Sequence, residues 1–411
     1  MNFNEFIKYF NKKYPNPSER GYKFENYAKW FLENDPVYKI LFKKIWNWNN
    51  WPKRWGRDDG IDLIGEDKDG NFWSIQSKFY DEDNYLTKKD IDSFIAQSGN
   101  KKIYGMYIIS SSDKFSSNSL RQISNHEKEI ITIGTRELSR IDWPKEELLR
   151  KKTKIFKPSP ESHQKDAIKK VIDGFKKNDR GKLIMACGTG KTLTGLWIKE
   201  KIKPKKTIIF FPSLSLLSDS LFEYCKHKKD NFDILSVCSD MTVAKGTDEF
   251  FEETDSLSFP VTTDIDKVIN FLKKKNDSII FSTYQSSEVI QNSLKILKNF
   301  SFDLGIFDEA HRTVGKKESL FSNPLNNKKI RIKKRLFMTA TPKFTGKIIK
   351  TKALEFDHEL ISMDDNDIYG DTFYELRFSE AIEKKLLSNY QVVICFVSDV
   401  DIKNMITKRT L

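Results

Sequence analysis

Cysteine is scarce in this chain of 411 residues, which contains only Cys187, Cys225, Cys238 and Cys395. The four are scattered and form no Cys-x-x-Cys pair, so the sequence indicates neither a zinc site nor a disulfide framework. Isolated cysteines are typical of proteins that stay in a reducing compartment. We therefore expect a cytoplasmic protein.

Long apolar runs are also missing. No run approaches the ~20 residues that a membrane-spanning helix needs. The residues after Met1 lack the basic-then-apolar pattern of a signal peptide. No internal repeat and no low-complexity tract is visible, and we expect no membrane partner.

Basic residues are in excess, with 71 Lys and Arg against 58 Asp and Glu and a formal net charge of +13. Lysine-rich runs occur at residues 151–154, 203–206 and 328–335. Such charge favours a polyanion, because binding releases its counterions. Any single run is better explained as solvated surface in a lysine-biased proteome. The composition therefore agrees with DNA as a partner without proving it.

Residues 185–192 read Met-Ala-Cys-Gly-Thr-Gly-Lys-Thr and lie between an apolar run and a helical pattern. This strand–loop–helix context suits a phosphate-binding loop, because backbone N–H groups of the turn and helix start can point at phosphates. A Gly-Lys-Thr sequence alone can also be a tight turn. In the phosphate-loop reading the lysine reaches the β/γ-phosphates and the final threonine ligates Mg²⁺. The candidate contacts are Gly188, Thr189, Gly190, Lys191 and Thr192.

Two acidic residues follow the apolar run 304–307 in the sequence Asp308-Glu309-Ala310-His311. A strand that ends in paired carboxylates can put Asp308 on magnesium and Glu309 near the attacking water. An exposed acidic turn would explain the pair alone, but its occurrence downstream of a phosphate loop disfavours that alternative. Residues 339–341, Thr-Ala-Thr, follow a further strand-like run and could couple phosphate state to domain movement.

Together these motifs resemble the first motor domain of a superfamily 2 helicase or translocase, over roughly residues 155–362. The resemblance implies ATP and Mg²⁺ as cofactors and adds Gln164 and His311 to the nucleotide site. Gln164 looks like the family's adenine-reading glutamine, although a polar residue at a helix start explains it equally well. Residues 212–217 and 282–286 match positions where such motors touch the nucleic-acid backbone, and their hydroxyl groups and amides suit phosphate contacts.

A second chemistry lies in a predicted hairpin formed by residues 57–65 and 71–78, joined by an Asp-Lys-Asp-Gly turn. Gln76 and Lys78 are two residues apart on one strand and share a face. Asp62 could stand beside them across the hairpin. A carboxylate and a side-chain oxygen can hold Mg²⁺, and a lysine amine can orient or activate water. A surface hairpin with scattered charges is the plain alternative.

The Asp…Gln-x-Lys pattern resembles the PD-(D/E)xK nucleases of the Mrr-like branch, in which Gln replaces the usual acidic residue. The preceding segment 21–32 has helical apolar spacing, and Glu25 flanks its apolar stripe. The family carries a glutamate there that can complete the metal site, although a solvated helix-face glutamate would look the same. Asp58 and Asp59 are further candidates for supporting that site.

Residues 33–36, 51–56, 91–94 and 362–365 extend the resemblance to the type ISP restriction–modification enzymes and their predicted-helicase relatives. Those enzymes fuse an Mrr-like nuclease to a DNA-translocating motor, followed by a methyltransferase and a target-recognition domain. The resemblance implies double-stranded DNA as substrate. It also implies that a second motor domain, which supplies transition-state arginines, the methyltransferase and the target-recognition domain act in cis or in trans.

We therefore expect the N-terminal nuclease and ATP-dependent translocase portion of a restriction endonuclease. One alternative is an anti-phage or repair nuclease–helicase without a methyltransferase. Another is a catalytically weak ATP- and DNA-binding remnant of a truncated gene.

The predicted fold class is α/β. Residues 1–150 form a PD-(D/E)xK nuclease-like domain with strands at 103–110 and 130–133, and 151–160 form a linker. Residues 161–362 alternate strands and helices, which implies a RecA-like domain with a parallel sheet. The expected strands there are 207–211, 234–237, 279–282 and 304–307, with a polar loop at 240–263.

Residues 363–411 should begin a second RecA-like domain, with a helix at 379–387 and a strand at 391–397. Trp46, Trp48, Trp51 and Trp55 could stack on bases, but such residues more often belong to a core.

Overall fold

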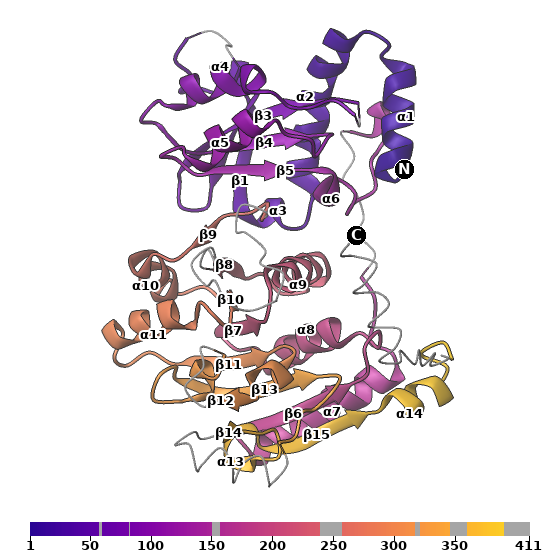
Figure 1. Ribbon diagram of the computed structural model, residues 1–411, viewed down its shortest axis with the longest axis vertical. Coiled ribbons are helices and arrows are strands. Elements are labelled where there is room, and N and C mark those ends of the chain that lie inside the picture. The colour runs from indigo at the N-terminus through magenta and orange to yellow at the C-terminus, as the bar shows by residue number, and fades with distance from the viewer. Residues whose placement is uncertain are drawn as a thin grey trace, which may run out of the picture.

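The computed structural model describes residues 1–56, 60–81, 83–149, 157–238, 257–316, 321–345 and 360–389. Figure 1 shows two stacked lobes, an N-terminal lobe (residues 1–149) and a C-terminal lobe (residues 157–389). No helix in these described ranges is both long and apolar enough to cross a lipid bilayer.

The N-terminal lobe is a sheet with helices on both faces. Its elements are α1 (Phe3–Lys13), α2 (Pro17–Asn34), α3 (Tyr38–Leu41), β1 (Phe42–Asn47), η1 (Trp48–Asn50), β2 (Leu63–Asp67), β3 (Phe72–Lys78), α4 (Lys88–Ser98), β4 (Ile103–Ser110), α5 (Ser117–Ser124), β5 (Ile130–Ile133), α6 (Thr135–Leu138) and η2 (Glu146–Leu148).

The C-terminal lobe alternates strands and helices. Its elements are α7 (Ser162–Lys177), β6 (Arg180–Met185), α8 (Lys191–Ile202), β7 (Lys206–Phe211), α9 (Leu214–His227), β8 (Asp233–Val237), β9 (Val261–Thr262), α10 (Ile265–Lys273), β10 (Ser278–Thr283), α11 (Ser287–Ile296), β11 (Phe302–Phe307), η4 (Ala310–Thr313), β12 (Gly315–Lys316), η5 (Asn323–Leu325), β13 (Ile332–Thr339), β14 (Leu360–Ile361), α13 (Asn366–Tyr369), β15 (Asp371–Leu376) and α14 (Phe378–Glu383).

The sheet of the N-terminal lobe has the order β1-β2-β3-β4-β5. Strands β1, β2 and β3 pair antiparallel, whereas β3, β4 and β5 pair parallel. The predicted hairpin is confirmed, with Leu63 opposite Ile75. Helix α2 begins at Asn16, whose side chain accepts the amides of Ser18 and Glu19. Its apolar stripe, which includes Phe24, is buried in the core of this lobe.

The clustered tryptophans belong to a second core of the same lobe. Trp48 and Trp51 are buried, and Trp46 and Trp55 pack partly buried against the same cluster. The prediction that these residues belong to a core is therefore confirmed for Trp48 and Trp51. Their buried rings do not support the alternative that they stack on bases.

The C-terminal lobe is built on a sheet of eight strands within the described residues, ordered β15-β6-β13-β11-β7-β10-β8-β9. All its strand pairs are parallel, as the alternating pattern predicts. Helices α7, α8 and α9 pack with one set of strand residues, and α10 and α11 with the other. Along β7, for example, Ile209 and Phe211 face the first core, whereas Ile208 and Phe210 face the second.

Two predictions for the C-terminal half are corrected by the structure, and a third lies outside the described residues. Strand β15 pairs parallel with β6, so the first RecA-like sheet extends past the boundary expected at residue 363. Its Phe373 ring packs where Gly174 and Gly181 leave no side chain in the way. Helix α14 is shorter than the predicted helix, and the strand predicted at 391–397 lies outside the described residues.

The predicted loop 240–263 and linker 151–160 are described only in part. Val261 and Thr262 form the short strand β9 beside β8, so the expected loop ends earlier than predicted. Residues 239–256 and 151–156 lie outside the described ranges.

The two lobes meet at the short helix α3. Val37 and Ile40 are buried in a core of the C-terminal lobe, whereas Tyr38 is buried in the core of the N-terminal lobe. The Tyr38 hydroxyl donates to the carbonyl of Ser258 at 2.7 Å. Asp35 accepts the amides of Val37 and Tyr38 and so starts the helix, and burial raises the pKa of Asp35 to about 7. This corner joins the lobes through packed apolar groups.

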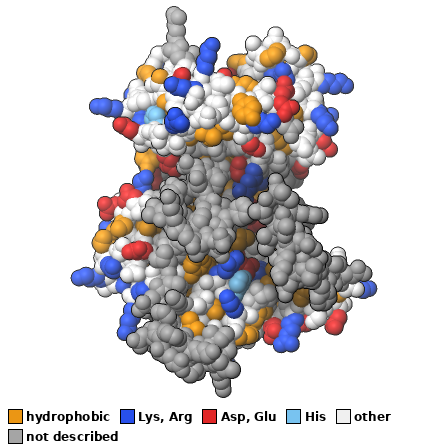
Figure 2. Space-filling model, in the orientation of Figure 1, with side chains coloured by type: hydrophobic (Ala, Val, Ile, Leu, Met, Phe, Trp, Pro, Cys, Tyr) orange, Lys and Arg blue, Asp and Glu red, His pale blue; other side chains and the backbone are white. Residues whose placement is uncertain are grey.

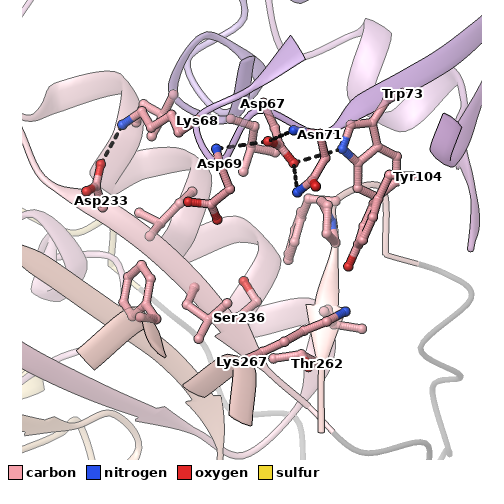
Figure 3. A pocket seen from close by; sticks show the side chains of 18 of the residues that line it. Asp67, Lys68, Asp69, Asn71, Trp73, Tyr104, Asp233, Ser236, Thr262 and Lys267 are labelled. Atoms are coloured by element: carbon pink, nitrogen blue, oxygen red, sulfur yellow. Dashed lines mark hydrogen bonds and ion pairs between the residues drawn. The ribbon is translucent and has the colours of Figure 1, made fainter. Parts of the chain in front are cut away.

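The turn between β2 and β3 makes a second contact between the lobes (Figure 3). The Asp67 carboxylate shapes this turn by accepting the backbone amides of Asp69 and Asn71 and the Trp73 indole N–H. Next to it, Lys68 pairs with Asp233 at the start of β8 at 2.6 Å. Asp69 likewise pairs with Lys274. A cavity of about 440 Å³ lies between these ion pairs and the apolar side chains of both lobes.

A charge-reversal cycle should test the Lys68–Asp233 contact. Lys68→Glu and Asp233→Lys should each lower the free energy of unfolding by ~0.5 kcal/mol, because each places like charges together. The double variant should recover most of that loss. Urea unfolding at low salt measures all four proteins.

The control uses Lys43, which pairs with Glu66 inside the N-terminal lobe at 3.3 Å. Lys43→Glu and Asp233→Lys should be additive, because the two residues do not share a contact. Additive losses for Lys68→Glu and Asp233→Lys as well would show that the pair does not bridge the lobes in solution.

Candidate nuclease and nucleotide sites

The predicted phosphate loop connects the end of β6 to the start of α8. Gly188 and Gly190 have φ values of 81° and 79°, in the left-handed region that favours glycine. Lys191 is the first residue of α8 and Thr192 is the second. The helix N-terminus and the turn therefore present backbone N–H groups where a phosphate group would approach.

Gln164 lies against this loop, as the sequence predicts for a nucleotide-site residue. Its amide nitrogen lies 3.4 Å from the Thr189 carbonyl, and the ring of His163 contacts the same carbonyl at 3.0 Å. The Gln164 side-chain oxygen accepts the backbone amide of Glu161. Gln164 thus serves as a helix-start residue and contacts the loop, and its recognition of adenine stays a prediction.

The acidic pair reaches the loop from the end of β11. Lys191 Nζ and Glu309 Oε1 form an ion pair at 2.9 Å, although the residues are 118 positions apart. Glu309 has a φ of 45°, an unusual left-handed conformation for this residue type. Binding of a phosphate group to Lys191 would compete with this ion pair.

Asp308 is buried, and its Oδ1 atom has no hydrogen-bond partner. Burial, together with the nearby Glu309 charge, raises the pKa of Asp308 to about 6, while Lys191 opposes the shift. A buried carboxylate oxygen without a donor is costly unless a cation or proton satisfies it. The Asp308 position therefore fits the magnesium ligand that the sequence predicts.

His311 connects the acidic segment to the Thr-Ala-Thr segment. Its Nδ1 atom lies 2.9 Å from Thr339 Oγ1 and 3.4 Å from Glu309 Oε2. The Thr341 amide donates to the same Thr339 hydroxyl. Burial lowers the pKa of His311. A change at Glu309 can therefore reach residues 339–341 through a single side chain.

Residues 212–217 and 282–286 are the two segments expected to touch the nucleic-acid backbone. They are hydrogen-bonded to each other, and the second is also hydrogen-bonded to the acidic pair. The hydroxyl of Tyr284 donates to the Asp308 carbonyl at 2.8 Å, and the Gln285 amide donates to the Pro212 carbonyl at 3.4 Å. Sequence reasoning missed the role of Tyr284, because a buried tyrosine gives no local sign of a partner 24 residues away.

In the N-terminal lobe, Asp62 directly precedes β2. Since Leu63 pairs with Ile75, continuing the register by one residue places Asp62 opposite Gln76. The Asp62 Oδ2 atom accepts both the amide of Ser77 at 2.6 Å and its hydroxyl at 2.9 Å. The structure therefore brings Asp62 to the Gln76-Ser77-Lys78 segment, as the hairpin pattern predicts.

Gln76 is buried, and its amide nitrogen donates to the Gly60 carbonyl at 3.0 Å. Its Oε1 atom is buried without a hydrogen-bond partner, so it fits a cation ligand. Gly60 has a φ of 120°, and a Cβ there would lie 2.9 Å from Ser93 Oγ and 3.0 Å from the Phe94 amide nitrogen. Only glycine fits at position 60, because any side chain there would collide with Ser93 and Phe94. This requirement was not predicted from the sequence.

Lys78 ends β3 and is half-buried. Against the effect of burial, hydrogen bonds from Thr87 hold the pKa of Asp90 below its usual value, and the Lys78 charge contributes. Glu25 follows Phe24 on α2, and the Phe24 ring packs edge-on against Phe79 with ring centroids 5.2 Å apart. Helix α2 therefore approaches the end of β3 at Phe24, and the position of Glu25 at the nuclease site stays a prediction.

Asp58 and Asp59 lie outside the described residues. Within the described ranges, no group of three or more His, Cys, Asp or Glu side chains is placed to hold a metal ion.

Two protein families match consecutive parts of the chain. Residues 33–153 match a family described as restriction endonuclease, and residues 157–344 match the res subunit of type III restriction enzymes. The chain thus joins a nuclease-family domain to a helicase-family domain, and the α/β class predicted from the sequence is confirmed.

A solved structure of the ATP-dependent Type ISP restriction-modification enzyme LlaBIII bound to DNA is similar over both lobes. The identity is 32% with a TM-score of 0.76, covering 90% of this chain and 25% of that one. A nuclease-deletion mutant of the Type ISP enzyme LlaGI is 33% identical over 56% of this chain and 21% of its own, with a TM-score of 0.43.

A probable helicase of African swine fever virus is 25% identical over 232 residues, 56% of this chain and 23% of its own. The chain therefore spans about a quarter of the length of these relatives. The resemblance to type ISP enzymes that the sequence motifs indicate is confirmed.

Replacing the loop lysine should test the nucleotide site. Lys191→Ala should weaken ATP binding by roughly 100-fold, because a charge-assisted contact to phosphate is lost. Titration with a fluorescent ATP analogue in Mg²⁺ measures this. Lys201→Ala, an exposed lysine on the same helix, is the matched control and should bind as the wild type. Equal binding by Lys191→Ala would disprove the assignment of the loop.

Proposed function

We propose that this chain is the nuclease and ATP-dependent DNA-translocating portion of a type ISP restriction enzyme. The observation that carries the proposal is the similarity to a DNA-bound enzyme of this type across both lobes at once, at 32% identity over 90% of the chain. A single shared fold would not distinguish among the many functions of RecA-like or nuclease-like domains. The occurrence of both lobes in the same order in one chain reduces the number of functions that fit.

In the proposed motor site, the amides of residues 188–191 and the Lys191 amine hold the ATP phosphates. Thr192 and Asp308 are the proposed magnesium ligands, and the unpaired buried oxygen of Asp308 supports that role. Magnesium would neutralise phosphate charge during transfer. Glu309 is the proposed acceptor of a proton from the attacking water.

The remaining nucleotide-site residues have supporting roles in this proposal. Gln164 lies against the loop and would read the adenine, and His311 would pass a change at Glu309 to residues 339–341. The Tyr284 hydrogen bond to Asp308 gives the DNA-facing segments a direct connection to the same site.

In the proposed nuclease site, Asp62 and Gln76 hold a divalent cation, which would polarise the scissile phosphate. Lys78 orients or activates the water, and Glu25 completes the site from α2. The unpaired Gln76 oxygen and the placement of Asp62 across the hairpin support this assignment.

Double-stranded DNA is the proposed substrate, and the cytoplasm is the proposed location. In Figure 2, Lys and Arg side chains are spread over both lobes among Asp and Glu side chains on the described part of this face. Contacts with DNA would therefore be distributed along the molecule. The proposed partners, in cis or in trans, are a second motor domain, a methyltransferase and a target-recognition domain.

The nuclease assignment predicts that Asp62→Ala and Lys78→Ala each reduce Mg²⁺-dependent nicking of plasmid DNA to background. The first removes a cation ligand and the second removes the amine that orients water. Binding of ATP should be unchanged, because the phosphate loop lies in the other lobe. Gel assays of supercoiled plasmid, with and without Mg²⁺, measure the nicking.

Lys89→Ala is the control for the lysine variant, since Lys89 is exposed on α4. It should nick DNA as the wild type does. If Asp62→Ala and Lys78→Ala nick at the wild-type rate, the nuclease chemistry lies elsewhere.

DNA binding should be independent of sequence and should weaken steeply with salt, since phosphate contacts dominate such motors. With six or more phosphates neutralised, affinity for random duplexes should fall by about 10³-fold between 50 and 200 mM salt. Fluorescence anisotropy with two unrelated duplexes measures both properties. A binding constant that hardly changes over this range would contradict a basic DNA-binding surface.

A further inference from the structure

Ser77 is the middle residue of the Gln-Ser-Lys segment and had no role in the sequence prediction. It is 6% exposed. Both of its hydrogen-bond donors, the backbone amide and the hydroxyl, bind the same Asp62 oxygen, at 2.6 and 2.9 Å. Two donors from one buried residue restrict how far that carboxylate can rotate.

This geometry follows from where the strands stop pairing. The pairing of β2 with β3 ends at Leu63 and Ile75, so beyond this point no strand residue of β2 faces the Ser77 amide. The Asp62 backbone is held instead, because its amide donates to the Ile75 carbonyl and its carbonyl accepts the Trp48 amide. The Asp62 carboxylate thus replaces the missing backbone acceptor at the end of the hairpin.

Ser77 is held equally firmly from the other side. Strand β3 pairs parallel with β4, where Ser77 lies beside Ile109. By strand alternation, the Ser77 side chain leaves the backbone on the face opposite to Gln76 and Lys78. Ser77 is therefore not placed to contact a cation beside Gln76 and can act there only through Asp62.

We propose that Ser77 is a positioning residue of the nuclease site, which orients the Asp62 carboxylate toward a divalent cation shared with the Gln76 side-chain oxygen. This rests on the proposed nuclease function. The buried, unpartnered Oε1 of Gln76 is the independent sign of a cation at this position. Residues that orient metal ligands typically change metal affinity by 10–100-fold when replaced.

The competing explanation is purely structural, with the Ser77 hydroxyl serving only to satisfy the end of the hairpin. The two explanations differ in what Ser77→Ala does. The substitution removes the hydroxyl but leaves the backbone amide bonded to Asp62. A structural role predicts lower thermal stability with unchanged metal affinity, whereas a positioning role predicts weaker metal binding in a folded protein.

The test measures Mn²⁺ binding to the nucleotide-free chain by electron paramagnetic resonance. The reference protein and all variants carry Asp308→Asn, so that the proposed cation ligand of the motor site does not contribute. Ser77→Ala should bind Mn²⁺ about 10-fold more weakly. Ser74→Ala is the matched control, because Ser74 is buried on the same strand but its hydroxyl bonds Ser98 at 2.7 Å. That control should bind Mn²⁺ as the wild type does.

A second readout separates affinity from turnover. In plasmid nicking, Ser77→Ala should need about 10-fold more Mg²⁺ for half-maximal rate and should approach the wild-type rate at saturating Mg²⁺. Ser77→Thr, which retains a hydroxyl, should restore most of the Mn²⁺ affinity, and it serves as the informative variant if Ser77→Ala does not fold. A folded Ser77→Thr protein with 10-fold weaker binding would overturn the proposal.

Asp62→Ala distinguishes failure of this inference from failure of the proposed function. It should abolish the Mn²⁺ binding that belongs to the nuclease site. If Asp62→Ala binds Mn²⁺ like the wild type, the nuclease site itself is misassigned. If Asp62→Ala loses the ion while Ser77→Ala retains wild-type affinity, the site stands and the positioning role of Ser77 is refuted.

Discussion

Parallel strand pairing is the constraint on which the candidate nucleotide site depends. Strands β6, β13 and β11 are neighbours in the sheet, so their carboxyl ends lie at one edge. The phosphate loop follows β6, the Thr-Ala-Thr segment follows β13, and the acidic pair follows β11. The ion pair between Lys191 and Glu309 and the contact between His311 and Thr339 result from this order. If these strands were not parallel neighbours, the segments that follow them would not lie at one edge of the sheet, and these residues would not be in contact.

The two proposed metal positions share one physical feature. Asp308 Oδ1 and Gln76 Oε1 are both buried oxygens that lack a hydrogen-bond donor. Leaving such an atom unsatisfied costs about 1–3 kcal/mol. A bound cation would remove that cost and convert it into affinity. In both lobes an unsatisfied buried oxygen marks the proposed cation position. It lies at the edge of a parallel sheet in the C-terminal lobe and at the end of a hairpin in the N-terminal lobe.

Much of this arrangement could be predicted because its signals are local. The glycines before Lys191, the carboxylates after an apolar strand and the two-residue spacing of Gln76 and Lys78 are all visible within a few residues. The placement of Tyr284 and of β15 could not be predicted this way. The Tyr284 hydroxyl donates to the carbonyl of Asp308, which directly follows β11, and β15 joins a sheet edge defined by β6, about 190 residues earlier. Only long-range packing selects such partners.

The β2–β3 hairpin gives the two lobes a common element. Its turn carries Lys68 and Asp69, which pair with the C-terminal lobe, and its open end carries Asp62 and the segment 76–78. Strand β2 has 5 residues and β3 has 7, which corresponds to roughly 17 Å and roughly 23 Å. Paired strands resist bending along their length more than a loop does. Through its paired strands, the hairpin therefore connects the ion pairs at its turn with the proposed nuclease residues at its open end.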